Sequence, residues 1–224
     1  MAVLEYDGTD YNGFQIQEEG TNTIQGKLGE VLSKVLNKKV DFRYAGRTDA
    51  GVHARYQVIS FKTDSNLDTH RFLWSVNSLL PDDIVIKKIE KVNPDFDARR
   101  SAALREYSYF VVNKNYHSVF LKKYSILIAK ELDIRSMRKA AGMFIGVRDF
   151  GSFCSPSCLK SDTVRKVFRF TVEKNREDMI IFKIAANSFL YNMVRIIVGT
   201  VLEIGSGNRD LKSISEALAG RNRK

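Results

Sequence analysis

The stretch Ala45-Gly46-Arg47-Thr48-Asp49-Ala50-Gly51-Val52-His53-Ala54 separates two runs that are typical of β-strands, residues 39–44 and 56–62. Two glycines bracket it, and glycine permits backbone angles that other side chains disfavour. An arginine, a hydroxyl and a carboxylate stand at its three consecutive positions 47 to 49. The stretch is therefore interpreted as a loop or as the frayed ends of those two strands. A tight turn with a local ion pair is the alternative.

The elements around this loop follow one another as strand, helix, strand, strand, helix and strand. Residues 2–6 are predicted to form the first strand, and Asn22 or Thr23 is predicted to cap the first helix. A second helix is expected at about residues 69–80, and a strand at 84–92 closes the set. This βαββαβ order is that of the ferredoxin-like unit.

The same order begins again after a connector at residues 93–100. The elements predicted there are a strand at 104–113, a helix at 133–145, a strand pair at 164–174 and 179–186, and helices at 189–204 and 210–218. A closing strand is absent from this second set. The predicted fold is α+β, with two ferredoxin-like halves, residues 1–102 and 103–224, forming a mixed or antiparallel sheet with helices on one face and a central cleft.

The chain carries a net charge of +10 and a pI near 9.6, which indicates a polyanionic partner. The excess is uneven, because residues 1–102 have a net charge of −1 and residues 103–224 one of +11. A basic surface that simply faces water remains an alternative. The excess of positive charge lies entirely in the second half.

Several classes of protein are disfavoured by the sequence. No apolar run reaches the roughly 20 residues that cross a bilayer, and the N-terminus has neither a basic leader nor a cleavage site. The two cysteines, Cys154 and Cys158, have no histidine nearby and are interpreted as a reduced pair in a cytoplasmic protein. Because metal-ligand spacing, a phosphate-binding glycine loop and a dinucleotide fingerprint are also lacking, no metal and no cofactor are expected.

A basic residue stands out in the predicted helix at 189–204. Arg195 lies among residues that are apolar around most of the helix circumference, so its guanidinium is predicted to be buried. A buried guanidinium needs a carboxylate, and no acidic residue lies within four positions of it. Asp49 is the candidate partner, and it would keep a lowered pKa beside the cation. The alternative is that Arg195 reaches the surface at one edge of the helix.

Aromatic and basic residues share one face of the predicted strand at 104–113. Alternation places Arg105, Tyr107 and Tyr109 on the same side. Such a face suits a nucleobase, although packing within the sheet is the alternative. Arg165, in the strand at 164–174, is a candidate phosphate contact, and a solvated strand face is an equal possibility for it.

The string at residues 45–54 resembles that of the bacterial tRNA pseudouridine synthases of the TruA type. Residues 6–17 are similar to the opening motif of that family, with Phe14 where a tryptophan is usual. The resemblance implies that Asp49 is the catalytic aspartate, that Arg47 lies beside the flipped-out base, and that Tyr107 stacks on the target base. It also implies that Arg195 pairs with the aspartate. Members of the family continue beyond this chain's last residue into a segment that supplies the missing strand.

The resemblance implies isomerisation of uridine to pseudouridine in the anticodon stem-loop of tRNA. It further implies a homodimer that binds one tRNA across both subunits, without a small-molecule cofactor. A non-catalytic RNA-binding module or tRNA chaperone is the alternative, because the fold and the charge would serve it equally well. A hydrolase is disfavoured because no second carboxylate or metal motif accompanies Asp49.

Overall fold

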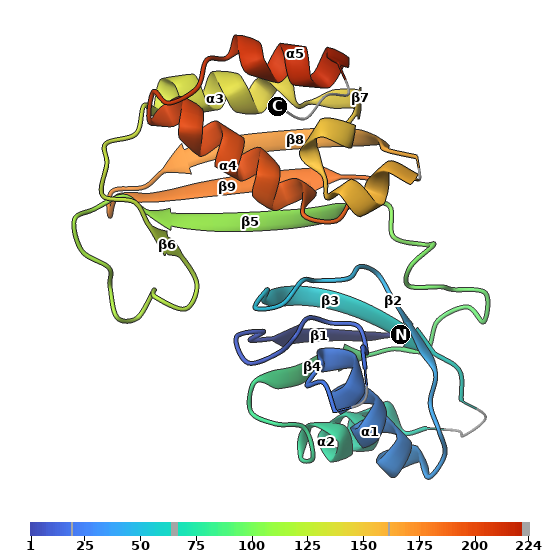
Figure 1. Cartoon of the computed structure of the whole chain (residues 1–224). Coiled ribbons are helices and arrows are strands. Elements are labelled where there is room, and N and C mark those ends of the chain that lie inside the picture. Colours follow the sequence, from blue (N-terminus) through green and yellow to red (C-terminus); the bar gives the residue numbers. More distant parts are fainter. Residues whose placement is uncertain (19, 64–66, 161, 221–224) are drawn as a thin grey trace. The chain divides into compact units, whose positions relative to one another are not determined.

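The structure is a computed structural model that describes residues 1–18, 20–63, 67–160 and 162–220. It contains two compact units, Met1–Ala103 and Leu104–Lys224, each with one sheet and its own helices (Figure 1). The sequence placed the division between residues 102 and 103. The α+β class is confirmed. The expected joining of the two halves into one sheet beside a cleft stays a prediction.

The first unit has the predicted βαββαβ order. Its elements are β1 (Ala2–Tyr6), α1 (Ile24–Leu36), β2 (Phe42–Tyr44), β3 (Ala54–Phe61), α2 (Thr69–Asn77) and β4 (Ile84–Ile89). The sheet order is β2-β3-β1-β4, and each pairing is antiparallel. Because β3 lies between β1 and β2, the unit has the split arrangement of the ferredoxin-like fold, and this part of the prediction is confirmed.

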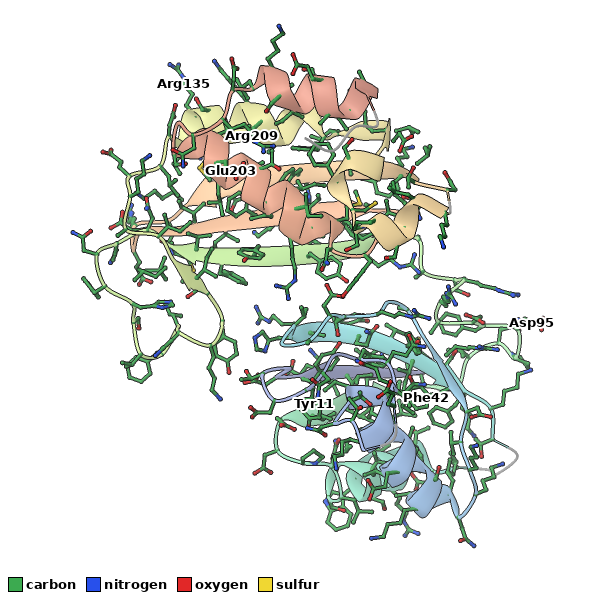
Figure 2. All side chains as sticks on the ribbon, viewed as in Figure 1. Tyr11, Phe42, Asp95, Arg135, Glu203 and Arg209 are labelled. Carbon is green, nitrogen blue, oxygen red and sulfur yellow. The ribbon has the colours of Figure 1, made fainter. Side chains whose placement is uncertain are left out.

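The helices of the first unit begin at side-chain caps. The Thr23 hydroxyl accepts a hydrogen bond from Gly26 N, and the Asp68 carboxylate accepts from two amides of the first turn of α2. The apolar stripe of α1 packs into a core that also contains Tyr11 and Phe42 (Figure 2). Tyr11 belongs to the segment between β1 and α1, so this segment is tied into the core rather than lying over it.

The second unit repeats the pattern with additions. Its elements are β5 (Arg105–Val112), β6 (Ile126–Leu127), α3 (Ile134–Met143), β7 (Gly146–Asp149), the 3₁₀ helices η1 (Gly151–Phe153) and η2 (Pro156–Lys160), β8 (Val164–Lys174), β9 (Met179–Ala186), α4 (Met193–Gly205) and α5 (Lys212–Gly220). The sheet order is β6-β5-β9-β8-β7, with β6 parallel to β5 and the other pairings antiparallel. The sheet is therefore mixed, and α3 and α4 cover one face of it (Figure 1).

Several features of the second unit differ from the sequence prediction, and the short strands and the start of α4 are the main ones. The strands β6 and β7 were not predicted, because runs of two and four residues are too short to show alternation. The helix α4 begins at Met193 rather than at residue 189, because Asn192 has a φ of 62° that a continuous helix does not allow.

Beyond α4, Arg209 Nε lies 2.8 Å from Glu203 Oε2, and the pair fastens the turn toward α5 (Figure 2).

Candidate active site

The loop between β2 and β3 carries the Arg-Thr-Asp sequence and is held by backbone hydrogen bonds. Phe14 N donates to Thr48 O at 3.0 Å, and Gly51 N donates to Tyr11 O at 3.2 Å. Both partners belong to the segment between β1 and α1. Asp49 therefore lies between two main-chain anchors, one on each side of it in the sequence.

Two glycines allow these segments to touch backbone to backbone. A Cβ atom at Gly8 would lie 2.1 Å from Val52 O, and one at Gly13 would lie 2.8 Å from Thr48 O. Gly13 also has a φ of +95°, which side chains rarely adopt. Residues 7–14 thus form a support that fits the Arg-Thr-Asp loop only when glycine stands at both positions, Gly8 and Gly13.

Side chains add further links between the support and the loop. The hydroxyl oxygens of Tyr6 and Thr48 lie 2.8 Å apart. The Gly8 amide donates a hydrogen bond to His53 Nδ1 at 3.1 Å when the ring is neutral. The same nitrogen lies 2.9 Å from Asp7 Oδ1, which can form an ion pair with the charged form of the ring. These contacts flank Asp49 on both sides, at positions 48 and 53.

The support is itself anchored to the end of the sheet. The Tyr11 hydroxyl donates to Asp83 Oδ1 at 2.7 Å, and Asp7 N donates to Asp83 O at 2.9 Å. Burial raises the pKa of Tyr11 well above its usual value, and the Asp83 carboxylate raises it further. Tyr11 therefore stays protonated and donates this bond throughout the physiological pH range.

Arg47 and Asp49 lie two residues apart in the same loop, with Arg47 exposed and Asp49 half-buried. A carboxylate in a loop whose main chain is anchored loses little entropy when it meets a substrate. The arrangement can present one oxygen nucleophile or base, together with a cation, to a polyanionic ligand.

Tyr107 and Tyr109 on β5 lie on the same face of the sheet, as the alternation predicted. Both pack against the core of the second unit. The rings of Tyr107 and Phe189 meet edge to face with centroids 5.1 Å apart, and Arg105 Nη1 donates to Asn187 O at 2.8 Å. This end of β5 is thereby joined to the segment that leads into α4.

Arg195 lies in α4 as predicted, but the prediction that it is buried is wrong. The buried side of α4 is made by Met193, Ile197, Val198, Thr200, Val201, Ile204 and Gly205, whereas Arg195 is exposed. The helix is rich in apolar residues, so its sequence did not reveal that one side of it lies outside the core. Arg195 therefore takes the alternative position at the edge of the helix, and its pairing with Asp49 stays a prediction.

Arg165 is half-buried at the start of β8, with 17% of its side chain exposed. Its Nη1 atom donates to Asp162 O at 3.1 Å and to Val164 O at 2.6 Å, and it lies 3.7 Å from Asp162 Oδ2. The guanidinium fastens the turn that precedes β8. Its contact with an RNA phosphate stays a prediction.

Sequence reasoning missed the residues that support the loop, namely Gly8, Gly13 and the hydroxyl pair of Tyr6 and Thr48. The two glycines in the polar segment before α1 were the available signal. The hydroxyl pair left no signal, because it joins positions 42 residues apart.

The split βαββαβ unit and its Arg-Thr-Asp loop agree with the resemblance to the tRNA pseudouridine synthases. The family model described as tRNA pseudouridine synthase matches residues 2–99 and 140–224. The chain belongs to the tRNA pseudouridine synthase family.

Curated relatives agree with this assignment. The protein named tRNA pseudouridine synthase A from Thermoanaerobacter sp. (strain X514) is 41% identical over 223 residues, covering 100% of this chain and 91% of the relative. Proteins of the same name from Geobacillus sp. (strain WCH70) and Bacillus pumilus are 43% and 42% identical, each covering 100% of this chain and 90% of the relative. A chain in a crystal structure of a Cbf5-Nop10-Gar1 complex is 14% identical in sequence, and the match covers 91% of this chain and 45% of that chain. Its TM-score of 0.37 is too low to bear on the fold.

No helix within residues 1–18, 20–63, 67–160 and 162–220 is both long enough and apolar enough to cross a membrane.

Proposed function

We propose that this pseudouridine synthase isomerises uridine in the anticodon stem-loop of tRNA, with Asp49 as the catalytic carboxylate. One observation carries the assignment of the residue. Asp49 is the acidic member of a loop that is anchored on both sides by Tyr11 and Phe14. A reacting group has to be held close to its productive geometry, and this loop is built to do that.

The reaction breaks the bond between ribose C1′ and uracil N1 and forms one between C1′ and C5 of the same ring. The hydrogen on C5 leaves as a proton and N1 gains a proton, so the composition of the nucleotide is unchanged. The target base has to leave its stack, which costs a few kcal/mol. Asp49 acts as nucleophile or as base while the N1 bond breaks. The exposed Arg47 steadies the displaced nucleotide. The rearrangement needs no redox partner and no second acceptor.

The second unit supplies the remaining groups of the proposal. Tyr107 holds the detached uracil while it turns, and Arg195 keeps Asp49 ionised by favouring its charged form. Arg105 and Arg165 contact the RNA. The net charge of +11 on residues 103–224 supports this role. The enzyme acts in the cytoplasm as a homodimer.

The deciding experiment compares the native protein with the Asp49→Asn variant on an unmodified tRNA transcript. Pseudouridine is mapped by carbodiimide-dependent primer-extension stops, and tRNA affinity is measured by fluorescence anisotropy. We expect the variant to bind tRNA within about twofold of the native affinity and to form no pseudouridine.

Two results would contradict the proposal. Stops at positions outside the anticodon stem-loop would refute the assigned target. Native protein that binds tRNA and leaves every uridine unmodified would favour the non-catalytic RNA-binding alternative.

A further inference from the structure

The β5–β6 loop, residues 113–125, exposes large apolar side chains. Phe120 is 86% exposed, Val119 81% and Tyr116 66%. Figure 1 shows the loop extending away from the sheet of its own unit. It lies outside residues 2–99 and 140–224, which are those that the family model matches.

The loop is held by its own hydrogen bonds. Leu121 N donates to Ser118 O at 3.1 Å, so Val119 and Phe120 occupy the two central positions of a turn. His117 Nε2 lies 2.9 Å from Ser125 Oγ, across the base of this turn. Turn centres usually carry polar residues or glycine. Here the hydrogen bonds present a phenylalanine to solvent instead, which indicates a binding surface.

The base of the loop is closed independently. The Asn113 side-chain amide donates to Ile128 O at 2.9 Å and to Lys130 O at 2.8 Å. These bonds, together with the pairing of β6 with β5, bring the two ends of the loop together. The loop is thus largely ordered before any partner arrives, which lowers the entropic cost of binding.

The charge of the loop is of one sign. Residues 113–125 contain Lys114, Lys122 and Lys123 and neither aspartate nor glutamate. The Nζ atom of Lys114 lies 5.7 Å from the centroid of the Tyr116 ring, and Lys122 and Lys123 directly follow the turn and are exposed. Exposed rings interleaved with lysines are what single-stranded or unstacked nucleotides bind, because bases stack on the rings and phosphates meet the cations.

We propose that the β5–β6 loop is an RNA-binding surface, with Phe120 stacking on an unpaired base and Lys122 and Lys123 contacting phosphates. The identification of that RNA as tRNA rests on the proposed function. A second copy of the chain is the competing occupant. A two-fold contact through this loop would bring the same lysines of both copies together, so like-charge repulsion favours the polyanion.

The test uses full-length protein carrying Asp49→Asn, so that binding is measured without turnover. In this background, Phe120→Ala is expected to weaken tRNA binding about tenfold, as the loss of one stacked base does. The pair Lys122→Ala and Lys123→Ala is expected to lower the slope of log affinity against log salt by about 1 to 2. Matched controls are Leu159→Ala, an exposed apolar residue on η2, and the pair Arg135→Ala and Lys139→Ala on α3. Both controls should stay within about twofold.

Unfolding midpoints close to that of the parent protein show that each variant is folded. Native-like affinity and salt slope in both loop variants would overturn the proposal. Conversion of a dimer into a monomer by Phe120→Ala, with tRNA affinity unchanged, would assign the loop to a second copy and also overturn it. Weakened tRNA binding in the loop variants, together with a native Asp49 protein that forms no pseudouridine on the same tRNA, would leave the loop assignment standing and refute the catalytic function.

Discussion

The hydroxyl oxygen of Tyr6, at the end of β1, lies 2.8 Å from that of Thr48, the residue between Arg47 and Asp49. One of the two central strands of the first sheet is thereby joined directly to the Arg-Thr-Asp loop. A buried ring that ends in a hydroxyl can hold a loop residue at a fixed height above the sheet. The position of the Asp49 carboxylate thus depends on a contact that is remote in the sequence.

Removing this contact should lower the turnover number of an enzyme that remains folded. Tyr6→Phe loses one neutral hydrogen bond, so we expect unfolding to become easier by about 1 kcal/mol. We expect kcat for pseudouridine formation to fall about tenfold with little change in KM for tRNA. Thr48→Val should have a similar effect, and the double variant should lose no more than either one, as a double-mutant cycle would show. Additive losses would mean that the two hydroxyls act separately.

The close approach at Gly13 predicts a specific loss of stability. Gly13→Ala places a Cβ atom 2.8 Å from Thr48 O at a φ of +95°. We expect a destabilisation of about 2–4 kcal/mol in urea unfolding, from backbone strain and the displaced loop. Gly20→Ala is the matched control, because Gly20 has a φ of +84° and no atom of the described residues lies within 4 Å of its Cβ position. The control should cost about 1 kcal/mol from strain alone. Equal losses in the two variants would show that the contact with Thr48 has no effect.

The caps of the helices predict how stability depends on pH. The Asp133 carboxylate accepts hydrogen bonds from the Ser136 hydroxyl and from the first amides of α3, and these bonds lower the pKa of Asp133 below its usual value of 3.8. Its contribution to stability is therefore complete above that value and is lost as the pH falls through the lower pKa of the folded state. In Asp133→Asn, which retains a capping side chain, urea midpoints between pH 2 and 7 should show a correspondingly weaker acid dependence. An identical dependence in both proteins would contradict this.

Because Arg195 is exposed, its replacement should leave the stability nearly unchanged. Its proposed pairing with Asp49 predicts an effect on activity. Arg195→Met should shift the free energy of unfolding by no more than about 0.5 kcal/mol, as for other surface positions. If Arg195 keeps Asp49 ionised, the pKa of Asp49 should rise in the variant, and the acid limb of the kcat profile should move to higher pH. Arg135→Met on α3 is the control and should leave the profile in place. An unmoved acid limb in Arg195→Met would remove the arginine from the proposed mechanism.

Much of the fold could be predicted from local signals. The boundaries of β8 and β9, at Val164–Lys174 and Met179–Ala186, follow from uninterrupted runs with a turn between them. Thr23, one of the two residues predicted to cap the first helix, does so. The short strand β6 and the delayed start of α4 could not be predicted, since a two-residue pairing and a positive φ at Asn192 depend on neighbours that are distant in the sequence.

By itself the sequence determined the α+β class, the first βαββαβ order and the Arg-Thr-Asp loop, because these depend on periodicity, capping and motifs within a few residues. Tertiary structure alone decided which groups support that loop and which side of α4 faces the solvent. Glycine is required at positions 8 and 13 because the backbone of residues 48–52 comes close to both. The exposure of Arg195 depends on where the core of the second unit ends. Burial and close approach arise only when elements pack against one another, whereas the amino-acid sequence shows which residues each element contains but not which of its sides is covered.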